Sequence, residues 1–225
     1  KITADAVVTK GNRYVKWAGY VMVAVTLIVG AFASSYYTAN GQVSFITNAG
    51  GGLVQVDETH GWNAKAPWQN VTKWDIFSRD VEYTGGDPSF TQGEIGGPFI
   101  QASVNGGAIA TFSLTGTYDL SNADYEQLFT TFRSQDRFTR QVIQPELLKI
   151  AKSTPSGFSA VEFRGSGIVT AADKILVDTN QRLEDTGVVF TVISIGNPDY
   201  PDNIDAAIAG VEEATIPFSV GWACA

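Results

Sequence analysis

The chain has 225 residues, of which 44% are hydrophobic and 17% charged, and its formal net charge at pH 7 is −8. This length suffices for one or two domains with a hydrophobic core. The charge is uneven, because residues 1–16 carry +3 and the remainder −11. An acidic main part argues against nucleic acid as a partner. The single cysteine, Cys224, excludes an intrachain disulfide and a cysteine-based metal site.

Residues 17–34 read WAGYVMVAVTLIVGAFAS and contain no charged side chain. As a helix they span about 27 Å, close to the roughly 30 Å of a bilayer's hydrocarbon core. Aromatic residues gather at both ends of the segment, as expected at two membrane interfaces. We therefore predict a transmembrane helix over residues 17–37. Its expected anchor residues are Trp17, Tyr20, Val21, Val25, Ile28, Phe32 and Tyr36.

Two other readings of this segment stay open. Ala33-Ser34-Ser35 resembles a signal-peptide cleavage site, and a long apolar helix can also be buried in a protein core. If the helix spans, the excess of basic residues before it favours a cytoplasmic tail over residues 1–16. The bulk of this single-pass protein then lies on the opposite, periplasmic or extracytoplasmic side.

The first part of the chain after the helix, residues 41–120, is expected to be rich in β structure. Alternating apolar residues and glycine-rich turns carry this expectation. The expected elements are a hairpin over 41–56, a loop over 61–68, a strand over 73–83, a loop with one short strand over 84–107, and a strand over 108–118.

The second part, residues 121–214, changes to helical periodicity and is expected to be α/β. Helices are predicted over 122–132, over 137–152 with a kink at Pro145, over 171–185 with a stop at Gly187, and from 203 onwards. The apolar run 188–195 predicts a strand that is central or covered on both faces. A tail over 215–225 completes an α+β fold with strands of mixed direction.

The sequence contains only weak patterns of residues that could catalyse a reaction or bind a metal. His60 stands beside two carboxylates, which is more typical of a solvated loop than of a metal site, and Gly165-Ser166-Gly167 lacks the spacing of a nucleophile elbow. Asn70-Val71-Thr72 fits a glycosylation sequon, although chance matches are common. We predict no catalytic residue, no metal site and no cofactor, and hence a protein that is not an enzyme.

The order of these strings resembles the SPFH family, or band 7 domain, which includes stomatin, prohibitin, flotillin and the bacterial HflK and HflC proteins. The membrane helix, the hairpin and the Gly-aromatic loop at Gly61-Trp62 follow the family layout. Three later strings are also similar to it: V-I-Q-P-E-L-L at 142–148, L-E-D-T-G-V at 183–188, and P-D-N-I-D-A-A-I at 201–208. Two places differ from the family, because 163–167 lacks an Arg-Glu pair and Pro217 follows where members continue into a coiled coil.

The resemblance implies a membrane-anchored scaffold whose copies assemble side by side into a large ring or cage, with themselves or with a paralogue. Such an assembly organises a membrane microdomain and possible clients include a membrane protease. Membrane lipids are the other implied partner. Two alternatives remain: a single-pass protein with a monomeric or dimeric partner-binding ectodomain, and a viral or envelope structural protein.

Contacts between copies are expected where opposite charges gather. A basic group lies in 133–152 and acidic residues lie in 173–185. The alternative is a solvated helix face without partners. The candidate oligomer contacts are Arg133, Arg137, Arg140, Lys149, Asp173 and Asp185.

Overall fold

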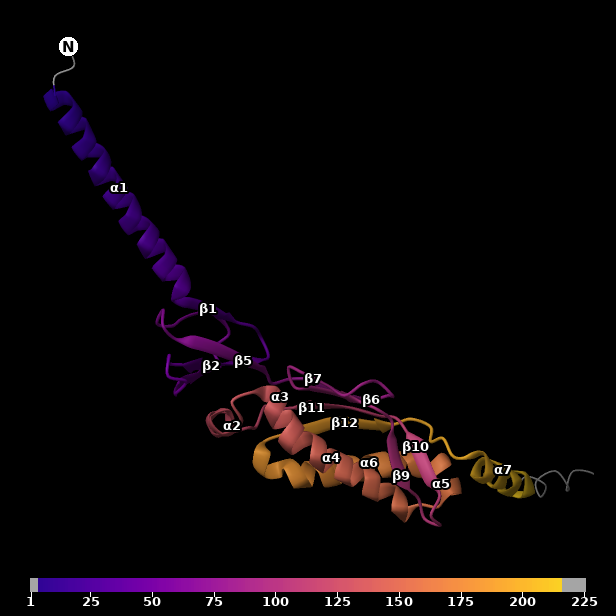
Figure 1. Cartoon of the computed structure of the whole chain (residues 1–225). Coiled ribbons are helices and arrows are strands. Elements are labelled where there is room, and N and C mark those ends of the chain that lie inside the picture. Colours follow the sequence, from indigo (N-terminus) through magenta and orange to yellow (C-terminus); the bar gives the residue numbers. More distant parts are fainter. Residues whose placement is uncertain (1–3, 216–225) are drawn as a thin grey trace, which may run out of the picture. The chain divides into compact units, whose positions relative to one another are not determined.

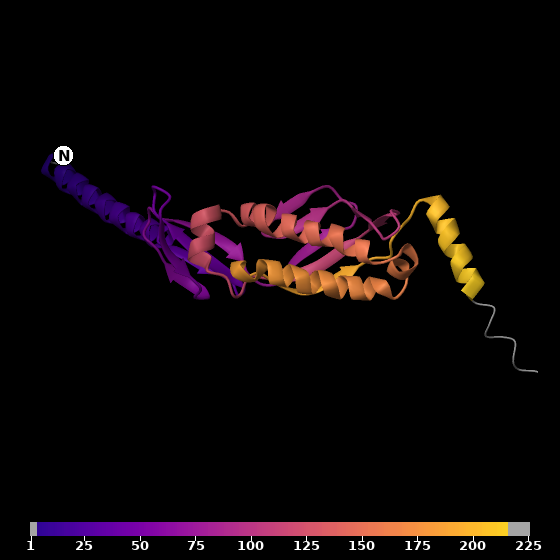
Figure 2. The ribbon, with the colours of Figure 1, turned by 90° about the horizontal axis from the view of Figure 1, so that it is seen from below.

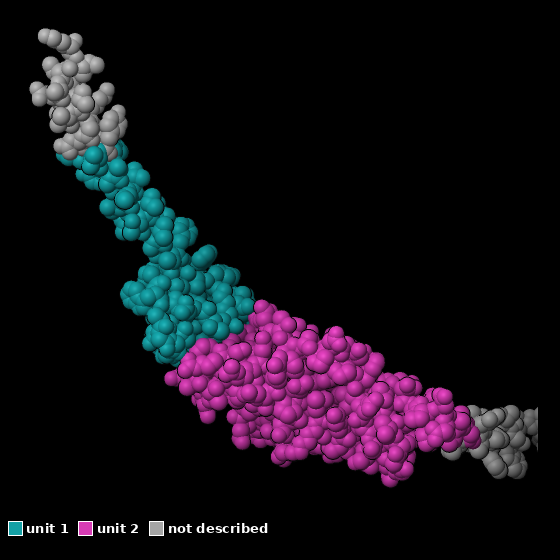
Figure 3. Space-filling model, in the orientation of Figure 1, with its two compact units in different colours: residues 1–73 teal, residues 74–225 magenta. Residues whose placement is uncertain are grey.

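The structure is a computed structural model that describes residues 4–215. The chain forms two compact units, residues 1–73 and residues 74–225 (Figure 3). An apolar helix is followed by mixed sheets and helices, which confirms the predicted α+β class (Figure 1). Of the expected tail 215–225, all but Thr215 lies outside the described residues.

The first unit consists of one long helix and small antiparallel sheets. Strand β1 pairs with β4, while β2 lies between β3 and β5. The predicted hairpin over 41–56 is confirmed, and its turn is closed by the Asn48 side chain, which accepts a hydrogen bond from the Gly52 amide at 2.8 Å. The elements are α1 (Ala4–Ala33), β1 (Ser35–Thr38), β2 (Gln42–Thr47), β3 (Leu53–Asp57), β4 (Gly61–Ala64) and β5 (Asn70–Asp75).

Three predictions for this unit are wrong: the end of the helix at residue 37, the loop at residues 61–64, and the position of Tyr36 in the helix. The helix ends at Ala33 rather than at residue 37, because residues 35–38 leave it to pair with 61–64, the segment predicted as a loop. Tyr36 therefore lies in a strand, where it is buried, and is not a lipid-facing residue of the helix. At the other end the helix begins at Ala4, inside the expected tail 1–16.

The second unit has a five-stranded sheet in the order β12-β11-β6-β8-β7. Strands β6 and β8 run parallel and the other neighbours are antiparallel, so the predicted mixed direction is confirmed. A separate pair is formed by β9 and β10. The strands are β6 (Arg79–Tyr83), β7 (Ser89–Thr91), β8 (Glu94–Gly97), β9 (Ile100–Ser103), β10 (Ile109–Phe112), β11 (Leu114–Asp119) and β12 (Val189–Ile195).

Helices cover one face of this sheet, with α4 and α6 lying side by side beneath it (Figures 1 and 2). Their apolar faces and the inward side chains of the strands form the core, which includes Tyr118, Leu147, Phe163, Ile175 and Phe190. The helices are α2 (Tyr125–Phe132), α3 (Gln135–Phe138), α4 (Gln144–Ser153), α5 (Ala160–Arg164), α6 (Gly167–Leu183) and α7 (Asp202–Thr215), with the short turns η1 (Thr139–Ile143), η2 (Thr154–Gly157) and η3 (Glu184–Thr186).

The strands of the second unit are shorter and more numerous than predicted. The run 73–83 is broken at Ser78, whose φ of 51° lies in the left-handed region, so it forms the end of β5 and all of β6. The run 108–118 is divided at Ser113 between two different sheets. The expected loop over 84–107 contains three short strands, β7, β8 and β9.

The helices follow the prediction with local differences. The first begins at Tyr125, where the Asp124 side chain caps the Gln127 amide, rather than at 122. Before Pro145 the backbone forms the π-helical turn η1, in which the Gln144 amide bonds to the Thr139 carbonyl. The wider turn accommodates a proline that clashes in a regular helix. The predicted stop at Gly187 is confirmed by its φ of 71°.

Strand β12 differs most from its prediction. It is an edge strand, whereas its uniform apolar sequence predicted a central or doubly covered one. Phe190, Ile193 and Ile195 are buried against the helices, but Val189 and Val192 are 39% and 55% exposed. Burial on this edge alternates except at Thr191 and Val192, which are both exposed because the pairing with β11 shifts register there, and the apolar outer side chains remain on the surface.

Gln135 fastens the first helices of the second unit to its first strand residues. It is 5% exposed, and its side-chain amide accepts a hydrogen bond from the Asp75 amide at 3.0 Å and donates one to the Asp75 carbonyl at 2.6 Å. Next to it, Trp74 stacks on Phe138 with ring centroids 6.3 Å apart. The amide thus completes the hydrogen bonding of a backbone segment that leaves the sheet.

We predict that Gln135→Ala lowers the free energy of unfolding of the second unit by about 2 kcal/mol, because both backbone groups of Asp75 lose their partner. Urea unfolding of the full chain in detergent, followed by tryptophan fluorescence, measures this. Gln127→Ala, at an exposed position of α2, is the control and should change stability by less than about 0.5 kcal/mol. Equal stability of the two variants would contradict the role given to Gln135.

Candidate membrane anchor and lateral contact surfaces

Helix α1 contains the one stretch in the described residues that is long and apolar enough to cross a membrane, Val15–Ala33. Its nineteen residues span about 28 Å, close to the thickness of the hydrocarbon core. None of this stretch is buried by the rest of the chain, so its side chains have no protein core to cover them. Six of the predicted anchor residues are each more than half exposed: Trp17, Tyr20, Val21, Val25, Ile28 and Phe32.

The carboxyl end of α1 is fastened to the sheet that follows. The Lys65 ammonium group donates to the Ala33 carbonyl at 2.8 Å, and the Lys65 amide donates to the Ser34 carbonyl at 2.8 Å. A cation at a helix carboxyl end also stabilises the helix dipole. Lys65 is distant in sequence, so only the β1–β4 pairing brings it here.

Tyr36 and Asp57 form a buried pair directly after the helix. The Tyr36 hydroxyl donates a short hydrogen bond to Asp57 Oδ2, and the Thr59 amide donates to Asp57 Oδ1 at 2.9 Å. Burial opposes ionisation of Asp57, but the hydrogen bonds from Tyr36 and Thr59 hold its pKa below the usual value. Burial and the neighbouring carboxylate raise the pKa of Tyr36, which therefore stays protonated.

Large aromatic side chains are exposed on the same small sheets and in the turn between β4 and β5. Trp62 is 75% exposed and Trp68 69%, and Tyr37 lies directly opposite Trp62 across the β1–β4 pair. The rings of Tyr37 and Trp62 meet edge to face with centroids 5.8 Å apart. Aromatic rings with a polar edge favour the level of lipid headgroups. This surface is suited to a position at the membrane boundary.

The candidate oligomer contacts fall into two separate places in the second unit. Arg133 ends α2, Arg137 and Arg140 lie on α3 and η1, and Lys149 lies on α4, whereas Asp173 is on α6 and Asp185 on η3. All six are exposed. Within one copy Arg137, Arg140 and Lys149 form no ion pair with a described residue, and the Arg140 guanidinium lies 4.5 Å above the Phe90 ring. The basic candidates thus lie between the end of α2 and α4, and the acidic candidates lie on α6 and η3.

The SPFH domain / Band 7 family profile matches residues 37–216, about four fifths of the chain. The chain belongs to this family. No curated protein matches it closely enough to be reported as a relative. The match covers the β sheets of the first unit after β1 begins and all described elements of the second, and the anchor helix precedes it.

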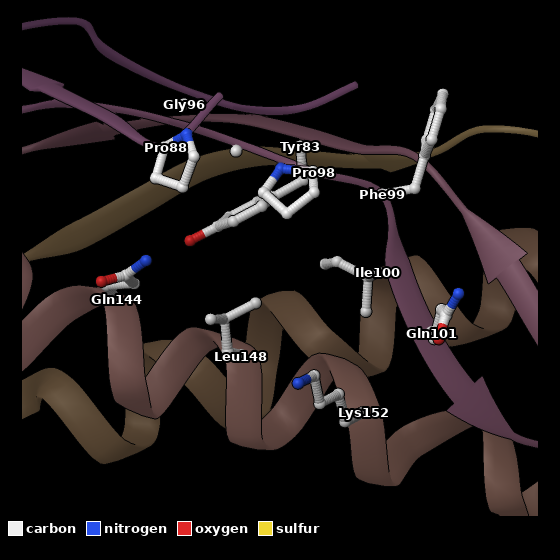
Figure 4. Close-up of a pocket in the computed structure, with 11 residues that line it drawn as sticks. Tyr83, Pro88, Gly96, Pro98, Phe99, Ile100, Gln101, Gln144, Leu148 and Lys152 are labelled. Atoms are coloured by element: carbon white, nitrogen blue, oxygen red, sulfur yellow. The ribbon is translucent and has the colours of Figure 1, made fainter. Parts of the chain in front are cut away.

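The SPFH domain has a surface groove in the second unit, between α4 and the segment that joins β8 to β9 (Figure 4). Its volume is about 470 Å³, and its walls include Pro98, Phe99, Ile100 and Leu148. The Tyr83 hydroxyl is buried, points toward the Gln144 amide in Figure 4 and forms no hydrogen bond of normal geometry. Sequence patterns did not reveal this groove, because its residues come from three separate segments.

The described part of the SPFH domain offers no cluster of metal ligands. Among residues 15–210 no three His, Cys, Asp or Glu side chains are placed to hold an ion. His60 is exposed, and Asp57 beside it in sequence is engaged with Tyr36. Sequence reasoning missed three residues described above: Lys65 at the end of α1, Asp57 in the pair with Tyr36, and Tyr83 in the groove.

The pair between Tyr36 and Asp57 predicts an acid-sensitive joint. A carboxyl whose pKa is lowered in the folded state contributes stability above its unfolded pKa of about 3.9 and loses it as the pH falls through the folded value. We predict that unfolding of the native chain between about pH 5 and pH 2 depends more steeply on pH than that of Tyr36→Phe. Melting temperature against pH, followed by tryptophan fluorescence, is the measurement.

The Tyr36→Phe variant should also be about 2 kcal/mol less stable at pH 7, where the charged hydrogen bond is lost. Tyr37→Phe, at the exposed neighbouring position, provides the control and keeps the pH profile of the native chain. Parallel acid profiles for native chain and Tyr36→Phe would show that Asp57 titrates as an ordinary surface carboxyl.

Proposed function

We propose that this chain is a membrane-anchored scaffold whose copies associate side by side into a large ring or cage. The assembly organises a membrane microdomain and encloses or regulates a membrane partner, for which a membrane protease is the first candidate. The observation that carries the proposal is α1, an exposed apolar helix of spanning length hydrogen-bonded through Lys65 to an SPFH domain. We assign it no catalytic step and no cofactor.

The anchor supports lateral assembly by simple geometry. Each copy carries the same helix, so all copies stand at one height and face the same way, and they meet only by sliding together in the membrane plane. Contacts between two different surfaces, repeated around an axis along the membrane normal, close into a ring. The basic residues Arg133, Arg137, Arg140 and Lys149 of one copy and the acidic residues Asp173 and Asp185 of the next are the proposed contacts.

Orientation follows from the charge around the helix. The basic residues within 1–16, at the amino-terminal end of the apolar stretch, stay on the cytoplasmic side, and the SPFH domain lies on the opposite side. The exposed aromatic residues Tyr37, Trp62 and Trp68 then sit at the outer headgroup level and contact membrane lipids.

A second candidate function is favoured by the groove beside α4. An open groove whose walls include Pro98, Phe99, Ile100 and Leu148 is suited to holding part of another molecule. A monomeric or dimeric protein that binds a partner there is the alternative to a scaffold.

The two functions differ in particle size. We predict that the detergent-extracted native chain forms a megadalton species with ring or dome outlines. Light scattering with negative-stain imaging measures this, and a monomeric membrane protein of similar mass calibrates the contribution of detergent. Particles of one or two chains would overturn the scaffold and leave the partner-binding alternative.

The proposed orientation predicts which side of the membrane the second unit occupies. In a Cys224→Ser background, Thr84→Cys places a single thiol at an exposed position without a hydrogen-bonding side chain partner in the described structure. A membrane-impermeant maleimide should label it fully in right-side-out vesicles before any permeabilisation. Labelling that requires permeabilisation would place the SPFH domain on the cytoplasmic side.

A further inference from the structure

The five-stranded sheet of the second unit has two open edges of unequal length. Strand β12 spans seven residues, whereas β7 at the other edge spans three. Neither strand contains a charged residue or a proline. Proteins usually protect an exposed edge with charge, proline or a covering segment, because its free N–H and C=O groups pair readily with another strand.

One half of the β12 edge is covered within the chain. The Asn180 side chain on α6 donates to the Phe190 carbonyl at 3.0 Å and accepts from the Phe190 amide at 2.7 Å, as a neighbouring strand would. Beyond it, the Gly196 amide bonds inward to the Ser113 carbonyl at 2.9 Å. By alternation Ile195 and Ile193 turn their backbone groups outward. Residues 192–195 therefore form the open half of β12.

The two open edges lie at the same level of the sheet. One row of directly opposed residues crosses all five strands through Phe90, Ile95, Val81, Gly116 and Ile193. The next row crosses them through Ser89, Gly96, Glu82, Thr115 and Ser194. The rows that reach β7 are thus the rows that end in the open half of β12.

The directions of the two edge strands are also suited to pairing between copies. Strand β12 is antiparallel to β11, β11 to β6, and β7 to β8, while β6 and β8 run parallel. It follows that β12 and β7 run in opposite directions. A second copy shifted sideways, without being turned over, brings its β12 antiparallel to β7 of the first.

The charges beside the two edges are mixed. Arg140 lies over the Phe90 ring of β7, while the Asp136 side chain accepts a hydrogen bond from the Gly93 amide in the turn after β7. Beside β12, α6 carries Asp173 and Asp178 together with Lys174 and Arg182, and Lys174 is paired with Asp178. The match between the two edges therefore rests on the direction and the level of the strands.

We infer that neighbouring copies join by antiparallel pairing of β7 with residues 192–195 of β12, so that the sheet continues from one copy to the next. This inference rests on the proposed scaffold and names its contact. Phe90 lies opposite Ile193 of the neighbour, and Ser89 opposite its Ser194.

Cysteine cross-linking tests the pairing in native membranes. In a Cys224→Ser background, Ser89→Cys and Ser194→Cys place two thiols opposite each other across the proposed contact, about 5 Å apart at Cβ. Mild oxidation should give a ladder of dimers, trimers and higher multimers on non-reducing gels. Each single variant, and the matched pair Ser103→Cys with Ser194→Cys, should remain monomeric.

The outcomes separate this contact from the scaffold itself. Dimers formed by Ser194→Cys alone would replace the proposed contact by β12 self-pairing. A double variant that stays monomeric while the native particle is large would overturn the contact and leave the scaffold standing. A native particle of one or two chains would overturn both.

A charge at the contact provides a second readout. Val192→Lys should reduce the extracted particle to a few copies at unchanged melting temperature. Val54→Lys introduces the same charge at an equally exposed strand position, 53% against 55%, and should leave the particle intact. Equal particle mass in the two variants would also overturn the inference.

Discussion

The apolar helix α1 is the constraint on which the proposed assembly depends. Its stretch Val15–Ala33 is not buried by the rest of the chain, and a bilayer would surround these side chains with lipid while the backbone hydrogen bonds are satisfied within the helix. A copy held in this way would keep translation in the membrane plane and rotation about the membrane normal. In the proposed scaffold, surfaces on the flanks of the SPFH domain then meet those of other copies, and no copy is turned over.

The joint fastens the helix to the small sheets of the first unit. Strand β1 begins two residues after the helix, Lys65 donates hydrogen bonds to the carbonyls of Ala33 and Ser34, and Tyr36 is hydrogen-bonded to Asp57. A hydrogen bond from a neutral hydroxyl to a carboxylate is stronger when both groups are sheltered from water than when they are exposed.

Sequence reasoning succeeded where the signal is local. Short stretches of sequence were enough to predict the apolar helix, the end of a helix at Gly187 and the hairpin around Asn48. The order of strands and helices followed from such local patterns taken along the chain. Sequence reasoning failed where the structure of a segment depends on which other segment it pairs with. Residues 35–38 and 61–64 form strands because they pair with each other. Strand β12 has the apolar composition of a central strand, although it is an edge strand of its sheet in the described part of the chain. Lys65 and Asp57 gain their roles from partners far away in sequence, so the joint could not be predicted.

The shortness of β7 bears on how an assembly built through the proposed edges would grow. Three residues provide few backbone hydrogen bonds, so a single contact is weak and opens readily. An open arc has one contact fewer than it has copies, whereas a closed ring has as many contacts as copies, and the last contact forms between ends already held close together. Weak edges therefore favour complete rings over arcs and allow incorrectly sized arcs to come apart before they close.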